Sequence, residues 1–208
     1  MEDALQDYCD YAASLPTWTL GEEAQEIAQA SYNMPDDAVV VEIGAFLGAG
    51  TVLLAGARKL RGSGIVHTVD PFDGSGDAFS KPVYETILAE NAELTARQHF
   101  DQAIEGAELA DWVVAHQGLA HEVAATWDTP IDLLFLDADM SPKGARRIFE
   151  SWAPFLKVGG WIAIHNSDER EYDPEHEGNR LIVVEELLEP NWSGLETVHS
   201  LTFAQKMR

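Results

Sequence analysis

The alternation of short apolar runs with helical runs is the feature that most limits how this chain can fold. Residues 38–45, 64–72, 111–118, 130–139 and 158–167 are apolar over most of their length and have the length of a strand. A run with helical character follows each of them along the chain. Apolar strands that alternate with helices are typical of a parallel sheet with helices on both faces. The sequence therefore predicts an α/β fold.

Two segments flank this alternation. Residues 1–38 are expected to form a helical cap, in which Thr19 and Glu22 have the spacing of a capping box at a helix start. Residues 195–207 are expected to form two short strands that pair as a hairpin. The main domain should then span residues 39–208.

The residues that end each strand carry the functional signal, because ligands bind outside the carboxyl ends of parallel strands. The first strand leads into Glu42, Gly44, Gly48 and Thr51. Glycines allow a sharp turn and a close approach of the backbone to a ligand, and the following helix offers free N–H groups. The spacing is not the G-x-G-x-x-G of dinucleotide-binding loops. Glu42 would repel a phosphate and attract a cationic ligand.

The second and third strands also end in polar groups. Asp70 follows Gly44 at about the offset at which an acid binds ribose hydroxyls, and a carboxylate can accept both protons of a cis-diol. Gln117 and Gly118 end the third strand, where an amide and an open backbone could meet an adenine edge. Together these strand ends predict a nucleoside pocket without a phosphate cradle.

The charge of the chain limits its partners. It has 36 acidic and 13 basic residues, with a formal net charge of -23. Such a surface repels phosphate backbones and anionic lipid, so we expect neither nucleic acid nor membrane as a partner. Cys9 is the single cysteine, and residues 1–15 lack the basic start and apolar core of a signal peptide. Both features favour a cytoplasmic protein.

Two motifs resemble those of class I S-adenosylmethionine-dependent methyltransferases. "VVVEIGAFLGAGTVLLA" is similar to their glycine-rich first motif and "VHTVDPF" to their ribose-binding acid. The resemblance covers the chain from about Thr19 onward. It implies a Rossmann-like, seven-stranded, mostly parallel sheet with an antiparallel C-terminal strand, and S-adenosylmethionine as cofactor. The residues expected to bind that cofactor are Glu42, Gly44, Phe46, Gly48, Thr51, Asp70, Gln117, Gly118 and Asp137.

A longer stretch, residues 133–167, resembles the metal-dependent O-methyltransferases of the caffeoyl-CoA, catechol and macrocin types. In those enzymes an acid after the fourth strand and two residues after the fifth bind a divalent cation. The matching positions here are Asp137, His165 and Asn166. A carboxylate, an imidazole and an amide are together softer ligands than the two acids and one amide that those enzymes usually have. Either the site prefers an ion such as manganese or zinc over magnesium, or His165 is no ligand and bonds to backbone.

The resemblance leaves the general base open. Plant-type relatives have a lysine where this chain has Met140, and methionine cannot take a proton. The catalytic candidates are Asp137, His165 and Asp139, with Lys143 as a further base. A cation-bound hydroxyl could also lose its proton without a strong base.

Loops near the expected mouth of the pocket could shape an acceptor site. They carry Trp18, Phe46, Phe72 and Tyr172, and residues 165–178 form a charged loop that is either a lid or a solvated surface. The predicted function is methyl transfer to a hydroxyl of a small molecule, by a protein that could form a homodimer through its N-terminal helices.

Two other functions remain open at the level of sequence. A nicotinamide-dependent oxidoreductase would share the glycines and Asp70 but would lack its glycine fingerprint here. A methyltransferase fold that binds cofactor without catalysis would account for Met140 and His165.

Overall fold

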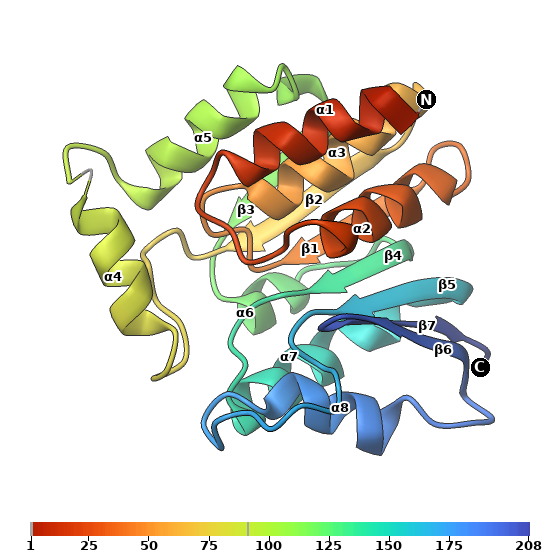
Figure 1. Cartoon of the computed structure of the whole chain (residues 1–208). Coiled ribbons are helices and arrows are strands. Elements are labelled where there is room, and N and C mark those ends of the chain that lie inside the picture. Colours follow the sequence, from red (N-terminus) through yellow and green to blue (C-terminus); the bar gives the residue numbers. More distant parts are fainter. Residues whose placement is uncertain (1, 91) are drawn as a thin grey trace.

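The computed structural model describes residues 2–90 and 92–208, with side chains from Ala4 onward. The strands of this part of the chain are β1 (Val39–Ile43), β2 (Ile65–Asp70), β3 (Val113–Gln117), β4 (Ile131–Leu136), β5 (Leu156–Ile164), β6 (Trp192–Val198) and β7 (Leu201–Lys206). They form one seven-stranded sheet in the order β3-β2-β1-β4-β5-β7-β6 (Figure 1). The first five strands are parallel to one another, and β7 runs antiparallel to both β5 and β6. The predicted Rossmann-like fold with an antiparallel C-terminal strand is confirmed.

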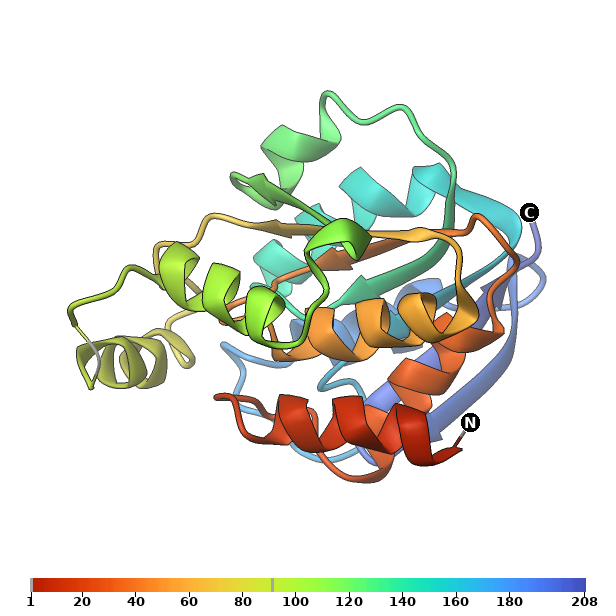
Figure 2. The same cartoon turned by 90° about the horizontal axis from the view of Figure 1, so that it is seen from above.

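Helices cover both faces of this sheet, as predicted. They are α1 (Glu2–Ala13), α2 (Glu22–Asn33), α3 (Ala49–Arg61), α4 (Lys81–Ala89), α5 (Ala96–Gly106), α6 (Ala120–Ala124), α7 (Pro142–Trp152) and α8 (Gly178–Glu186), with short 3-10 turns η1 (Ala110–Trp112) and η2 (Ala153–Phe155). Helices α1, α2, α3 and α5 lie on one face, and α6, α7 and α8 on the other (Figure 1, Figure 2).

Neighbouring residues of the central strands explain these two layers. Val40 and its partner Leu133 belong to the core beneath α1, α2 and α3, whereas Val41 and its partner Leu134 belong to the core beneath α7 and α8. Successive side chains of a strand point to opposite faces, so a strand buried on both sides must be apolar throughout. The continuous apolar runs of the sequence have this cause.

The N-terminal helices share the core of the first layer. Cys9 of α1 and Ile27 of α2 pack in the same cluster as Leu53 of α3. The buried guanidinium of Arg58 donates to the carbonyls of Ser31 and Pro35, at 2.7 and 2.8 Å. It thereby adds a charged donor to carbonyl groups at the end of α2 and in the turn that follows it.

The start of α2 differs from the prediction. The helix begins at Glu22 with Gly21, at a φ of 57°, as its N-cap residue. Thr19 is therefore not the cap, and the capping box predicted with Glu22 is wrong. The reason is local, because the Thr19 N–H donates to Thr17 Oγ1 at 3.1 Å and the chain turns before the helix starts.

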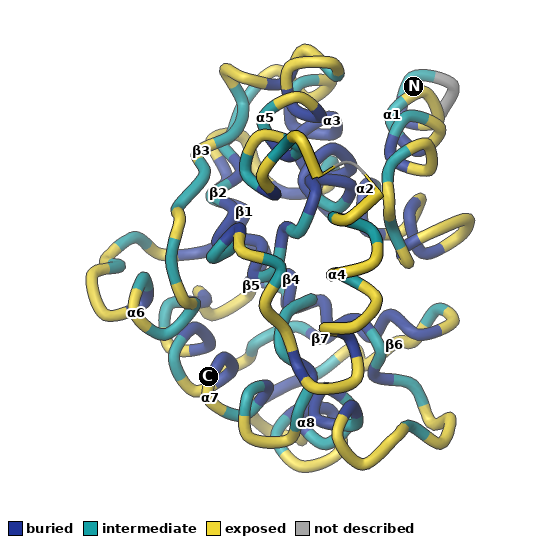
Figure 3. Tube along the Cα trace, turned by 90° about the vertical axis from the view of Figure 1, so that its left-hand side faces the viewer, coloured by how far each residue is buried: buried dark blue, intermediate teal, exposed yellow. Residues whose placement is uncertain are grey.

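The connection between β2 and β3 carries the part of the molecule that overhangs the strand ends. Here α4 and α5 are separate helices, and Thr95 with Gln98 forms a capping box at the start of α5. Figure 3 looks onto the carboxyl ends of the parallel strands, with α4 and its flanking loops lying across them. In the described residues, no helix has the length and apolar character needed to cross a membrane.

Candidate active site

The turns after β1 and β4 touch at the carboxyl edge of the sheet. The Gly44 N–H donates to Val69 and the Asp137 N–H donates to Ile43, each at 2.9 Å. Gly44 has a φ of 98°, and a Cβ atom there would lie 2.2 Å from the Asp137 carbonyl oxygen. A glycine at this position is thus required both by backbone conformation and by space. The contact places Asp137 directly beside the glycine turn.

A cavity of about 370 Å³ opens between the ends of β1 and β2 and the starts of α6 and α7. Its lining includes Gly44, Asp70, Leu119, His121 and Asp137. These are polar and apolar groups of the kinds that a nucleoside needs, and Gly44, Asp70 and Asp137 among them come from strand ends that the sequence indicated.

Asp70 is held in this cavity by the backbone. Its carboxylate accepts hydrogen bonds from the N–H of Phe46 at 2.9 Å and of Phe72 at 2.6 Å. Burial raises the pKa of Asp70 to about 6, although these hydrogen bonds partly offset the effect. The acid therefore joins the turns after β1 and β2 and faces the cavity.

Several residues predicted to bind the cofactor lie elsewhere. Gly48 packs against the ring of Phe100, and the Thr51 hydroxyl donates to Glu42. The Gln117 amide donates to the Pro71 carbonyl at 3.2 Å. Neither Gly48, Thr51, Gln117 nor the adjacent Gly118 is among the described residues that line this cavity or the next one. Beyond β3, the cavity wall is instead formed by residues 119–121, one step further along the chain.

Glu42 lies under the start of α3 and is almost fully buried. Its carboxylate accepts hydrogen bonds from the hydroxyls of Thr51 and Thr68. Burial raises the pKa of Glu42 to about 8, because these two hydrogen bonds compensate only part of the lost hydration. An acid of this kind is largely protonated near neutral pH and is ready to ionise when a cation approaches.

A second cavity, of about 360 Å³, shares Gly44, Phe46, Tyr84 and Asp137 with the first. Its aromatic wall is built from Phe46 and Tyr84, which stack at 4.6 Å, and from Trp18, whose ring lies 6.0 Å from that of Phe46. Tyr172 also lines this cavity, from the loop after β5.

The aromatic residues predicted at the mouth thus divide into two groups. Trp18, Phe46 and Tyr172 line the second cavity, whereas Phe72 is buried against Phe100 in the core, with ring centroids 4.9 Å apart. Phe72 thus fills the core and does not shape the acceptor cavity. Its backbone adopts a φ of 53°, and its side chain packs into the core with α5. Tyr84 was missed because nothing local in α4 marks it.

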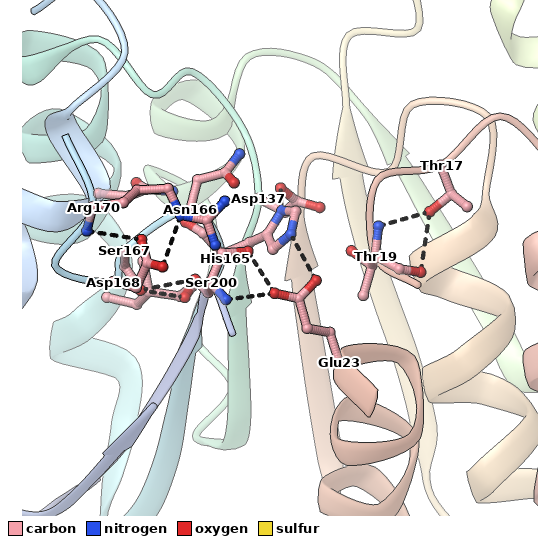
Figure 4. A network of polar contacts seen from close by, with 12 residues as sticks. Thr17, Thr19, Glu23, Asp137, His165, Asn166, Ser167, Asp168, Arg170 and Ser200 are labelled. Atoms are coloured by element: carbon pink, nitrogen blue, oxygen red, sulfur yellow. Dashed lines mark hydrogen bonds and ion pairs between the residues drawn. The ribbon is translucent and has the colours of Figure 1, made fainter. Parts of the chain in front are cut away.

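His165 bridges two carboxylates at the end of β5 (Figure 4). Its Nδ1 lies 2.9 Å from Asp137 Oδ1, and its Nε2 lies 3.7 Å from Glu23 Oε2. Burial alone would lower the pKa of His165, but the two carboxylates outweigh that effect and raise it to about 10. The two carboxylates therefore favour the protonated form of the imidazole, and the sequence alternative of a histidine bonded only to backbone does not describe it.

The donor set at these strand ends does not fit a divalent cation. Both ring nitrogens of His165 face carboxylates, and the Asn166 amide donates to the Met140 sulfur at 3.2 Å. Within the described residues, no three His, Cys, Asp or Glu side chains are grouped so as to hold a metal ion. An imidazolium has no lone pair to offer, so His165 in this state is neither a ligand nor a base.

The remaining catalytic candidates lie on the side of the first cavity. The Asp139 carboxylate accepts the Ser141 N–H at 3.0 Å and lies against Gly144 at the start of α7. Asp139 and Lys143 line the first cavity, whereas Asp137 lines both. Asp139 thus has the position of an acid at a helix N-terminus.

A pair that sequence reasoning missed lies between the two cavities, with His176 lining the second and Asp77 the first. His176, in the loop after β5, has its Nδ1 3.4 Å from Asp77, which lies in the loop after β2. Asp77 also accepts the N–H groups of Phe79 and Ser80, each at 2.9 Å. Burial opposes ionisation of Asp77, but His176 and Ser80 outweigh it and lower the pKa of Asp77 to about 2. His176 Nε2 lies on the side of Asn166, at 3.5 Å from its amide nitrogen.

Comparisons with known proteins agree with this geometry. A sequence model of the family described as "Methyltransferase domain" matches residues 41–167, more than half of the chain. The O-methyltransferase TomG from Streptomyces achromogenes, solved with S-adenosylmethionine (SAM), has a TM-score of 0.65 at 18% identity, over 99% of this chain and 90% of that one. An O-methyltransferase from Bacillus cereus, solved with S-adenosylhomocysteine (SAH), has a TM-score of 0.64 at 21% identity, over 98% and 91%. The chain therefore belongs to the methyltransferase domain family and has the Rossmann-like fold of the class I SAM-dependent methyltransferases.

Proposed function

We propose that this protein is a SAM-dependent O-methyltransferase that acts on the hydroxyl of a small molecule. The observation that carries the proposal is the junction of the two cavities at Gly44, Phe46, Tyr84 and Asp137. Asp70, which we expect to bind ribose, lines one cavity, and an aromatic wall lines the other. Their volumes are in the range of small-ligand pockets, roughly 300–1,000 Å³.

The cofactor would lie with its adenosine in the first cavity and its reactive methyl group at the junction. Asp70 would accept the ribose hydroxyls, and residues 119–121 would border the adenine. Glu42, which lines the second cavity close to Gly44, would ionise and pair with the ammonium group of the methionine portion. The relatives solved with SAM or SAH support this choice of cofactor.

The acceptor would lie in the second cavity, between the aromatic wall and His176. Asp77 would hold the Nδ1–H of His176, which leaves Nε2 free to accept the hydroxyl proton. The acceptor oxygen would then attack the methyl carbon as the carbon–sulfur bond breaks, and the sulfur would leave with both electrons as the thioether of SAH. Alignment of such a bimolecular reaction can contribute roughly 7–11 kcal/mol.

Calorimetric titration with SAH and with NAD, followed by a transfer assay with SAM and a panel of catechols and other phenols, tests the proposal. We expect micromolar or tighter binding of SAH, no binding of NAD and a product heavier by one methylene group. Binding of NAD without SAH would overturn it. Binding of SAH without turnover on any acceptor would favour a non-catalytic cofactor-binding protein, which Met140 at the lysine position keeps open.

A further inference from the structure

We propose that the buried bridge Glu23–His165–Asp137 stands in place of a divalent cation, so that the site works with a fixed internal positive charge. This inference rests on the proposed function, because it concerns the cofactor requirement of the same site. The bridge joins the first turn of α2 to the ends of β5 and β4, and Figure 4 shows its members converging.

The geometry of His165 excludes it from a ligand set. A histidine binds a metal ion through the lone pair of one ring nitrogen. Here each nitrogen faces a carboxylate oxygen, at 2.9 Å on the Asp137 side and 3.7 Å on the Glu23 side. His165 is only 2% exposed, so no water replaces either carboxylate as its partner at low cost.

The surroundings hold the bridge in this arrangement. Glu23 Oε1 accepts the Ser200 N–H at 2.6 Å and the Ser200 hydroxyl at 2.5 Å. The Asn179 amide donates to the His165 carbonyl at 2.7 Å. Contacts from the turn before β7 and from α8 therefore hold Glu23 and His165 in place. A cation could bind at Asp137 only by displacing the His165 ring from its place between two carboxylates.

The charge balance gives the bridge its function. A buried carboxylate must be paired, and a cation at a site of this kind supplies the positive charge. In this chain the imidazolium supplies it, and Asp137 still lines both cavities. Charge and orientation at the junction then come from the protein alone. The charge cannot be removed by a chelator.

The test is a titration of the full chain with MnCl2 at fixed ionic strength, with and without SAH, followed by calorimetry and by Mn²⁺ paramagnetic resonance. Because the net charge of -23 should attract Mn²⁺ weakly to the surface, Asp137→Asn serves as the matched control. We expect the wild type and Asp137→Asn to bind Mn²⁺ within twofold of each other. Loss of a Mn²⁺ site in Asp137→Asn, relative to the wild type, would overturn the proposal.

A second variant tests whether a metal site appears when the imidazole is removed. His165→Asp removes the internal charge and places three carboxylates together, and we expect it to bind Mn²⁺ at least tenfold more tightly than the wild type and to gain thermal stability in its presence. Adding Asp137→Asn to this variant should abolish the gain. A folded His165→Asp protein without the gain would contradict the proposal. If the variant does not fold, the wild-type comparison alone decides. Parallel SAH titrations keep the two proposals separate, because loss of SAH binding by the wild type refutes the methyltransferase proposal whatever Mn²⁺ does.

Discussion

Gly44 and Asp137 meet through their main chains, so closely that a Cβ atom on Gly44 would lie 2.2 Å from the Asp137 carbonyl oxygen. The contact joins the glycine turn to the acid that ends β4. Since Asp137 also bonds to His165, any shift at Gly44 is transmitted to the end of β5. The geometry at the junction of the two cavities therefore requires a residue without a Cβ atom at position 44.

Gly44→Ala should be far more damaging than an alanine at another glycine of positive φ. Gly62 has a φ of 79° and no neighbour within 4 Å, so Gly62→Ala should cost only the backbone strain, about 1–2 kcal/mol. Gly44→Ala adds steric overlap with backbone, about 1–3 kcal/mol more, and should abolish SAH binding. Urea unfolding and SAH calorimetry of both variants measure this. Equal losses would show that the contact with Asp137 does not matter.

Asp70→Ala should weaken SAH binding by about 1.5–3 kcal/mol, the range for hydrogen bonds to a charged group. Because Asp70 also accepts the N–H groups of Phe46 and Phe72, Asp70→Asn is the better test of the ribose contact: it preserves volume while removing the charge. Calorimetry with SAH measures both variants. Wild-type affinity in Asp70→Asn would place the ribose elsewhere.

Glu42 should make the free protein less stable as pH rises. Its pKa is about 8 in the folded chain and about 4.3 when unfolded, so its contribution is fully present below pH 4.3 and is lost as pH rises through 8. Glu42→Gln does not titrate. The difference in unfolding free energy between wild type and Glu42→Gln should therefore shift in favour of the variant between pH 5 and 8, as followed by urea unfolding. A difference independent of pH would mean that Glu42 is ionised in the fold.

Two adjacent acids of α2 offer a matched test of the buried bridge. Glu23 contacts His165 and Ser200 in the interior, whereas the Glu22 side chain is 72% exposed and pairs with exposed His199. Glu23→Gln should cost about 1–3 kcal/mol, because it removes the charge that accepts two hydrogen bonds from Ser200, while His165 keeps Asp137 as its closer partner. Glu22→Gln should cost about 0–1 kcal/mol, as surface pairs do. Denaturant unfolding at pH 7 compares them directly.

His176→Gln should slow methyl transfer without changing cofactor affinity. Loss of a general base lowers the rate typically about 10²–10⁴-fold. Asp77→Asn should also lower kcat, but by a smaller factor, because Nε2 of His176 remains while the ring loses the partner that orients it. The rate of SAH release with any accepted phenol, measured beside SAH affinity, tests this. Wild-type kcat in His176→Gln would assign deprotonation to another group.

The sequence determined the fold through local patterns. Runs such as residues 38–45 are apolar at every position but Glu42 because the strands are buried on both faces, and this pattern predicts a parallel sheet without knowledge of any contact. Gly44, Asp70 and Asp137 were identifiable for a related reason. They follow parallel strands directly, so their place at one edge of the sheet follows from chain order.

Only the tertiary structure decided the chemistry of the site, because the partners come from distant parts of the chain. His165 was identifiable as a strand-end residue, but the pKa of its imidazole is raised by Asp137 after β4 and also by Glu23, which sits on a helix that precedes the sheet. His176 and Asp77 are 99 positions apart, in two loops with no repeating pattern. A side chain's charge state and hydrogen-bond partners are set by what folding brings within a few ångströms, and no local period in a sequence encodes that neighbourhood.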